Sequence, residues 1–171
     1  SSINGLLYIR GHRQDYDHWR QLGNTGWSYE DVLPYFIRSE DQQNGEDDYH
    51  GTGGELSVQN MRAKRKICEA LIEAAGELGV PRNDDFNGAK QKGAGYFQQT
   101  SRNGRRCSTA IGFLNPVKSR KNLEIITHAL VERVLLDDLQ ATGIAISVKG
   151  QPRQYDLKPG GELVLSAGPI G

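Results

Sequence analysis

Three arginines lie close together in one short polar segment, where their side chains could bind a ligand. The segment reads RNGRRCS, and Arg102, Arg105 and Arg106 stand just before a stretch that we expect to be helical. Guanidinium groups beside a helix N-terminus could receive an anion, because the exposed N–H groups and the helix dipole both favour negative charge. A solvated turn is the alternative interpretation of these charges.

The histidines show no metal-ligand pattern. They stand at His12, His18, His50 and His128. A tetrahedral metal site needs clustered ligands such as H-x-x-x-H or paired Cys and His, and the chain has neither spacing. We therefore predict no metal site, and we expect each histidine to lie on the surface or in a hydrogen bond. The acidic segments DYDHW and NGEDDYHG lack the Gly and Glu pattern of a calcium loop, so we interpret both as solvated surface.

The two cysteines indicate a reducing environment. Cys68 and Cys107 lie far apart on segments that we expect to be helical, without metal-ligand spacing. We expect two buried free thiols and a cytoplasmic location, since unpaired cysteines are typical of reducing compartments. The chain shows no signal-peptide pattern, and no segment approaches the about 20 apolar residues that span a bilayer.

The composition is that of an ordinary globular domain or of part of a larger protein. The 171 residues include 36% hydrophobic and 25% charged side chains, and Lys+Arg and Asp+Glu each number 21. With a formal net charge of zero, no overall basic field would attract nucleic acid. The 21 glycines gather in GNTGW, HGTGGE, KGAGY and KPGGE. Such clusters indicate surface turns or loops whose backbone approaches a ligand closely.

The first two thirds of the chain predict four helices that would position these groups. Residues 15–22 place apolar side chains three apart, which favours a short helix. Ser28 is an N-cap candidate with an acid three residues on, and Pro34 predicts either a kink or a later start of the regular helix. KICEALIEAAGELG has an apolar face that we expect to pack on a sheet. CSTAIGFLNP predicts a helix of about two turns after Ser108 or Thr109.

The last third of the chain predicts β-structure. NLEIIT, LVERVLL, GIAISVKG and GELVLSAG carry apolar and β-branched residues at spacing two, separated by the turn-like DDLQAT and QPRQYDLKPGG. Strands and helices without regular alternation predict an α+β fold for the isolated chain. The final strand would end in Ser-Ala-Gly, whose small side chains allow a ligand to approach the carboxyl end of a sheet.

Six ordered blocks of sequence together cover essentially the whole chain. They read SSINGLLYIRGHRQDYDHW, LGNTGWSYEDVLPYFIRSED, YHGTGGELSV, NDDFNGAKQKGAGYFQQTSRNGRRCSTAIGFLNP, NLEIITHALVERVLL and LVLSAGPIG. In this order they resemble the glucose-methanol-choline family of FAD-dependent oxidoreductases, and the resemblance is greatest to its bacterial alcohol and choline dehydrogenase-like branch.

The resemblance implies an internal part of a longer enzyme. The family's G-x-G-x-x-G dinucleotide fingerprint lies upstream of the first block, and its catalytic histidine lies downstream of the last. This chain contains neither the fingerprint nor the segment with that histidine. We therefore expect part of a Rossmann-like FAD-binding α/β domain and part of a substrate-binding α+β domain. Residues 1–60 would form the flavin-covering loop and a helical segment, and 61–122 part of the substrate-side domain. Residues 123–171 would return to the FAD-domain sheet.

The resemblance also implies which residues meet the cofactor. The first block matches a family signature that packs on the flavin, and its contacting positions are Ser1, Ser2, Asn4, Gly5 and Leu7. Ile3 stands where some members carry a histidine covalently joined to FAD, which implies non-covalent FAD here. Val131 matches a residue whose main chain meets the adenine, and Ala167 lies at a strand end near the cofactor.

The activity implied by the family is oxidation of a small-molecule alcohol. A base takes the hydroxyl proton while the hydride on the CH–OH carbon passes to flavin N5. We predict no catalytic residue in this chain, because the base belongs to the family's C-terminal segment, and we expect the isolated chain to be inactive. The alternative is a stand-alone interaction module that binds no flavin.

Overall fold

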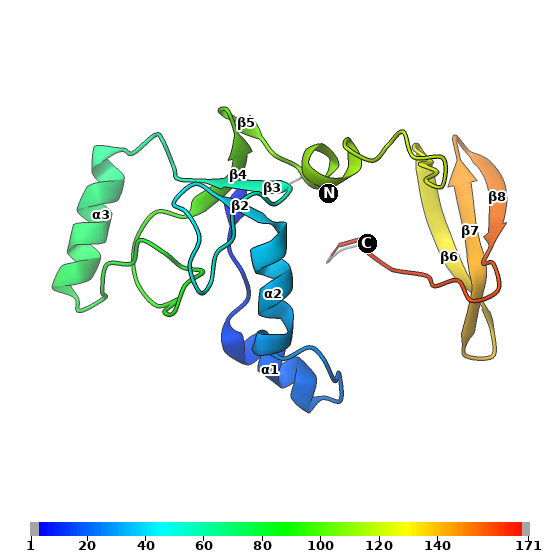
Figure 1. Cartoon of the computed structure of the whole chain (residues 1–171), viewed down its shortest axis with the longest axis horizontal. Helices are drawn as coiled ribbons and strands as arrows, with labels where there is room; N and C mark the ends of the chain where they lie inside the picture. The colour runs from blue at the N-terminus through cyan, green and yellow to red at the C-terminus, as the bar shows by residue number, and fades with distance from the viewer. Residues whose placement is uncertain (1–3, 169–171) are drawn as a thin grey trace. The chain divides into compact units, whose positions relative to one another are not determined.

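The computed structural model describes residues 4–168, which divide into two compact units. Residues 4–117 form the first unit and residues 118–168 the second, and Figure 1 shows the elements of each. Helices and strands occur together in the first unit and strands alone in the second. This mixed content confirms the predicted α+β class. No helix within residues 4–168 has the length and apolar content needed to cross a membrane.

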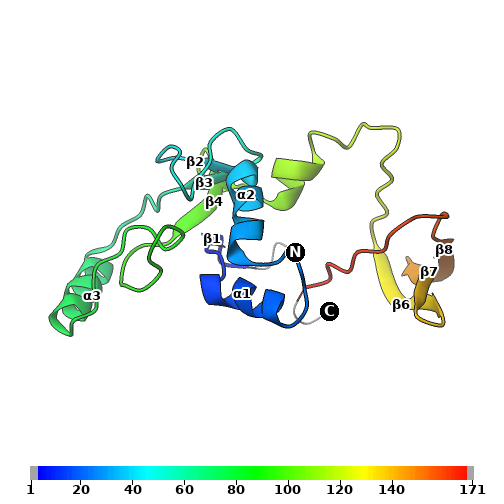
Figure 2. The same cartoon turned by 60° about the horizontal axis from the view of Figure 1, so that its bottom comes forward.

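The first helix, α1 (Arg13–Gln21), begins at a reciprocal cap. The His12 side chain accepts a hydrogen bond from the first turn, and the Asp15 carboxylate accepts one from the His12 N–H at 2.7 Å. The helix therefore starts earlier than the predicted residue 15. Its buried residue, Tyr16, packs against Phe36 of the next helix with ring centroids 5.9 Å apart. Figure 2 shows α1 lying against the beginning of that helix.

The second helix, α2 (Tyr29–Ser39), confirms Ser28 as its N-cap. The Ser28 N–H donates to the Asp31 carboxylate at 3.0 Å, and the Asp31 N–H donates back to Ser28 Oγ. Hydrogen bonds from the Ser28 side chain and backbone also lower the pKa of Asp31. Pro34 lies inside the helix. Of the two alternatives that Pro34 left open, the later start is therefore wrong, because the cap at Ser28 fixes the first turn ahead of the proline.

A five-stranded sheet organises the first unit. Its order is β1-β4-β3-β2, with β5 paired to β4. The strands are β1 (Leu7–Tyr8), β2 (Glu40–Gln42), β3 (Leu56–Gln59), β4 (Gln98–Arg102) and β5 (Arg105–Arg106). β2 and β3 are parallel and the other pairs antiparallel. Leu7 pairs with Gln99, so the sheet joins the opening segment to a strand far along the chain.

The glycines of HGTGGE allow close packing beside β2. A Cβ at Gly51 would overlap the carbonyl oxygen of Ile37, and one at Gly54 would overlap the backbone of Ser39. The loop thus lies directly on the end of α2 and the start of β2, and only glycine fits there.

The third helix, α3 (Lys66–Glu77), has the predicted position but not the predicted packing. Ile67 and Leu71 are 74% and 71% exposed, and no residue of the helix is buried. Within residues 4–168 no sheet covers this apolar face, so the predicted helix–sheet contact is wrong for the described chain. The amphipathic pattern predicted the helix correctly, but such a pattern does not indicate which element covers the apolar face.

The segment after β5 forms a short π-helix, η1 (Ala110–Leu114), instead of the predicted two α-helical turns. Ser108 Oγ accepts from the Ile111 N–H at 3.4 Å, and Thr109 makes no side-chain cap bond. The Asn115 N–H donates to the carbonyl of Ala110 at 2.8 Å. This wider turn uses up the last residues before Pro116, which cannot continue the helix.

The second unit is a three-stranded antiparallel meander of β6 (Ala129–Asp137), β7 (Gln140–Val148) and β8 (Gln151–Asp156). β6 and β7 confirm two predicted strands. β8 lies in a segment that was predicted to be a turn, and the predicted strands in NLEIIT and GELVLSAG are absent. Residues 161–168 have no hydrogen-bonded neighbour strand within the described chain, and an extended segment needs such a partner to form a sheet.

Candidate functional site

The opening segment is held in an uncommon backbone conformation. Asn4 Oδ1 accepts a hydrogen bond from the Leu6 N–H at 3.0 Å, which closes a tight turn. Leu6 has a φ of +69°, a left-handed conformation that is costly for a residue with a side chain. The carbonyl of Leu6 accepts from the Thr100 N–H at 2.9 Å and from its hydroxyl at 3.3 Å. β4, the strand next to β1 in the sheet, therefore holds this turn in place.

Side chains alternate between inside and outside beyond this turn. Leu7 and Ile9 are 50% and 47% exposed, whereas Tyr8 and Arg10 are buried. Successive side chains of an extended chain point to opposite faces, so the two apolar side chains share one uncovered side.

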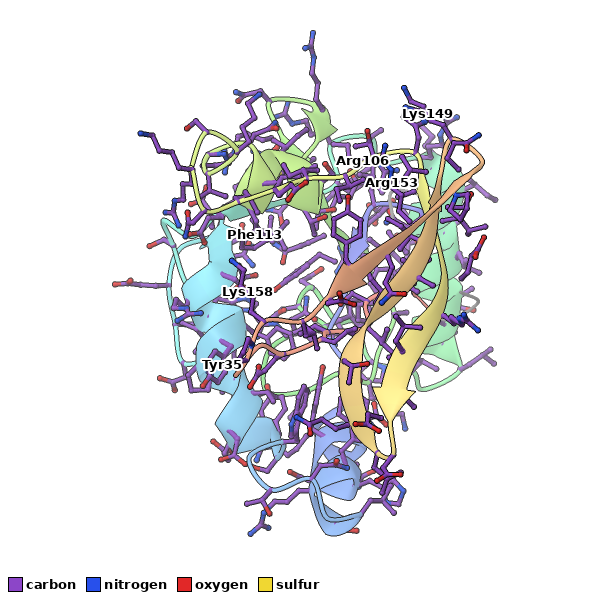
Figure 3. All side chains as sticks on the ribbon, turned by 90° about the vertical axis from the view of Figure 1, so that its right-hand side faces the viewer. Tyr35, Arg106, Phe113, Lys149, Arg153 and Lys158 are labelled. Atoms are coloured by element: carbon purple, nitrogen blue, oxygen red, sulfur yellow. The ribbon has the colours of Figure 1, made fainter. Side chains whose placement is uncertain are left out.

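Arg106 of β5 reaches back to Asn4. Its Nη1 donates to Asn4 Oδ1 at 2.5 Å, and its Nη2 donates to the Asn4 carbonyl at 3.0 Å. Figure 3 labels Arg106, together with Phe113 of the following η1. The predicted anion-binding cluster is therefore distributed differently: Arg106 binds the opening segment, and Arg102 donates to the carbonyl of Glu55 at 3.1 Å.

Arg10, Glu40 and His50 form a charged cluster of buried side chains beside β1, and the partly exposed Asp85 completes it. Arg10 Nη2 donates to Glu40 Oε2 at 2.8 Å, with side chains 2% and 0% exposed. His50 Nδ1 lies 3.0 Å from the same oxygen, and its Nε2 lies 3.1 Å from Asp85 Oδ2. The two basic side chains and the two carboxylates thus alternate in the order Arg10, Glu40, His50 and Asp85, so that their charges compensate one another. Within residues 4–168 every buried side-chain nitrogen and oxygen has a hydrogen-bond partner.

The cluster requires a protonated His50. Both ring nitrogens face carboxylate oxygens, so both must donate. Burial by itself lowers the pKa of His50, but the hydrogen bonds and charges of Asp85 and Glu40 outweigh it and raise the pKa to about 9. Burial by itself raises the pKa of Asp85, whereas hydrogen bonds from His50 and the Asn87 N–H bring it below its usual value.

Sequence reasoning missed this cluster and misjudged its surroundings. NGEDDYHG was interpreted as solvated surface, yet His50 is buried and the Tyr49 carbonyl accepts from Arg10 Nη1 at 2.7 Å. Cys68 is partly exposed and only Cys107 is buried, so the prediction of two buried thiols is wrong for Cys68. No pattern in the sequence indicated a buried His50, because the close packing of the following Gly51 on Ile37 is visible only in the structure.

The predicted cofactor residues fall into three groups. Asn4, Gly5 and Leu7 lie together at the opening turn of the first unit. The second unit contains Val131, which pairs with Ile146 between β6 and β7, and Ala167, which lies in an extended segment outside the strands. Ser1, Ser2 and Ile3 lie outside the described residues. Within residues 4–168 no cluster of three or more His, Cys, Asp or Glu could hold a metal ion.

A family model described as GMC oxidoreductase matches residues 1–171. An oxygen-dependent choline dehydrogenase of Sinorhizobium fredii is 42% identical over 98% of this chain and 30% of its own length. One of Pectobacterium atrosepticum is 45% identical over 99% of this chain and 31% of its own length.

Solved structures agree with these sequence matches. The crystal structure of pyridoxine 4-oxidase from Mesorbium loti superposes with a TM-score of 0.81 at 30% identity, over 90% of this chain and 31% of that one. An FAD-dependent oxidoreductase from Chaetomium thermophilum gives 0.80 at 26% identity, over 91% of this chain and 29% of that one. The chain belongs to the GMC oxidoreductase family. It spans about 30% of the length of the curated relatives that it matches.

Proposed function

We propose that this chain is part of an FAD-dependent oxidoreductase that oxidises the CH–OH group of a small alcohol. The observation that carries the proposal is the family match along residues 1–171. Relatives named choline dehydrogenase support an alcohol substrate, and a solved relative named as an FAD-dependent oxidoreductase supports the cofactor. The whole enzyme would extend beyond this chain, with residues 1–60, 61–122 and 123–171 in the domain roles set out above.

The opening turn is the part of this chain that best fits a flavin. Asn4 would offer its amide N–H groups, Gly5 would let the backbone approach, and Leu7 would cover the ring with its exposed apolar side chain. Ser1, Ser2, Val131 and Ala167 complete the proposed contacts. The left-handed backbone conformation of Leu6 supports this assignment, because strained conformations tend to occur at functional sites, where the surrounding structure holds them.

When bound, FAD would supply two-electron oxidation by taking up the hydride of the alcohol carbon. The hydroxyl proton would go to a base in the part of the enzyme beyond these residues, and the product would be the carbonyl compound. Residues 4–10 would hold the flavin in place and exclude water from one side of it. The two unpaired thiols support a cytoplasmic location.

The intact enzyme tests the proposal through its flavin. Purified enzyme should release FAD on acid precipitation, because Ile3 cannot form the histidyl bond. Anaerobic mixing with choline or another primary alcohol should bleach the flavin absorbance. A colourless protein would contradict the proposal and favour the alternative of a non-catalytic interaction module. Flavin retained in the acid pellet would contradict the non-covalent assignment alone.

A further inference from the structure

The orientation of the Asn4 side-chain amide follows from the two donors that bind it. The Leu6 N–H and Arg106 Nη1 both donate to one atom of the Asn4 side chain, at 3.0 and 2.5 Å. That atom must be the oxygen, since a side-chain amide nitrogen could accept neither bond. The two N–H donors of the amide therefore point away from Arg106 and Leu6. Within residues 4–168 no group accepts from them.

The guanidinium group of Arg106 makes two hydrogen bonds to Asn4 at once. It binds the side-chain oxygen and the main-chain carbonyl of Asn4 with two different nitrogens. A planar guanidinium can make two such bonds at once, whereas the ammonium of lysine acts as a single point charge. One side chain therefore fixes both the backbone position of Asn4 and the rotation of its amide.

The β4–β5 hairpin holds Arg106 itself in place. Arg106 pairs with Ser101, and the Cys107 N–H donates to the Thr100 carbonyl at 2.9 Å. The turn between the strands has positive φ at Asn103 and Gly104, the conformation that suits a tight hairpin. Thr100 of the same hairpin holds the Leu6 carbonyl. One hairpin thus fixes the opening turn at Asn4 and at Leu6.

We propose that Arg106 is a positioning residue that aims the amide donors of Asn4 at the FAD. The inference rests on the proposed function, which places Asn4 beside the cofactor. Arg106 acts through Asn4 and has no assigned role in the chemistry.

The test compares FAD binding to the apoenzyme across a double-mutant cycle, read by quenching of flavin fluorescence. Arg106→Ala should weaken FAD binding about tenfold, the size expected for losing a charge-assisted hydrogen bond. In an Asn4→Ala background the same change should cost about threefold or less, because the side-chain oxygen that Arg106 orients is already gone. Arg105→Ala is the matched control, with an exposed arginine on the same hairpin, and should bind FAD as the wild type does.

Two further readouts separate positioning from a general effect on folding. The visible circular dichroism of bound flavin should change in Arg106→Ala, and added guanidinium ion should restore it toward the wild-type spectrum, since Arg106 is only partly buried. Arg106→Lys should fall between the wild type and the alanine variant, and it decides the matter if the alanine variant does not fold.

The inference is overturned if Arg106→Ala, or Arg106→Lys in its place, binds FAD with wild-type affinity and spectrum. It is also overturned if the effects of Arg106→Ala and Asn4→Ala simply multiply. A wild-type enzyme that takes up no FAD would instead overturn the proposed function, and this inference with it. Wild-type binding of FAD separates the two failures.

Discussion

Arg10 and Glu40 form a buried ion pair that ties the opening segment to β2. The Nη2–Oε2 distance is 2.8 Å, and the two side chains are 2% and 0% exposed. Glu40 also lies 3.0 Å from His50. The carboxylate therefore serves two cations, and its loss would leave both without their shared partner inside the protein.

Glu40→Gln should destabilise the enzyme strongly. The substitution keeps the size of the side chain but leaves the buried Arg10 without a carboxylate partner and His50 with Asp85 alone. Removing one partner of a buried ion pair costs about 3–5 kcal/mol in comparable cases. Glu30→Gln is the control, because Glu30 pairs with Arg13 at 2.7 Å on the surface and such pairs contribute about 1 kcal/mol or less. Thermal melting of both variants checks the prediction. Equal shifts would show that burial of the Arg10–Glu40 pair contributes nothing extra.

The protonation of His50 should make stability fall in alkaline solution. Its pKa is raised in the folded enzyme to about 9, above an unfolded value of about 6.5. The stabilisation is therefore complete below about pH 6.5 and is lost as the pH rises through about 9. Asp85 affects stability in acid solution. Because its pKa is lowered in the folded protein, its contribution to stability is lost as the pH falls through that folded pKa.

Melting temperatures recorded between about pH 6 and pH 9.5 measure this loss. His50→Gln removes the titrating group and should show a distinctly shallower decline. Parallel curves for wild type and variant would show that His50 does not hold a proton between Glu40 and Asp85.

Two glycine-to-alanine changes should have opposite effects. At Gly51 a Cβ overlaps the carbonyl oxygen of Ile37, so Gly51→Ala should cost about 1–3 kcal/mol, the usual range for overpacking. At Gly76, inside α3, a Cβ meets nothing within 4 Å. Gly76→Ala should be stabilising by about 0.5–1 kcal/mol, because alanine loses less backbone entropy in a helix. Denaturant unfolding distinguishes them, and a neutral Gly51→Ala would contradict the close packing of the loop on α2.

Local patterns predicted the elements whose signals lie within a few residues. The cap at Ser28 fixed the start of α2, and the apolar spacing of β6 and β7 marked both strands correctly. The same logic failed for Ile67 and Leu71 of α3 and for residues 161–168. An apolar face indicates that burial is favourable, but it does not say which segment provides it.

The polar contacts of the candidate site could not be predicted from spacing. Arg10, Glu40, His50 and Asp85 come from four separate segments, and Asn4 and Arg106 are 102 positions apart. No local period relates such residues, because the sheet order brings them together. The resemblance of the first block to the family did single out Asn4, and the structure added the residues that hold it.

The most direct test of the account is single-turnover bleaching of the flavin by alcohol in Asn4→Asp and Asn24→Asp variants of the intact enzyme. Aspartate at position 4 keeps an oxygen for Leu6 and Arg106 but replaces the amide donors with a negative charge. Beside the ring, that charge opposes the electron density that flavin gains on reduction.

Asn24 provides the matched control. It lies in an exposed turn, where its Nδ2 donates to the Trp19 carbonyl at 3.0 Å. Its change to Asp should alter stability by about 1 kcal/mol or less and leave the bleaching rate unchanged. The account predicts bleaching at least about tenfold slower in Asn4→Asp, equivalent to a barrier increase of about 1.4 kcal/mol. Bleaching at the wild-type rate in a folded, flavin-loaded Asn4→Asp enzyme would contradict the placement of the opening turn on the flavin.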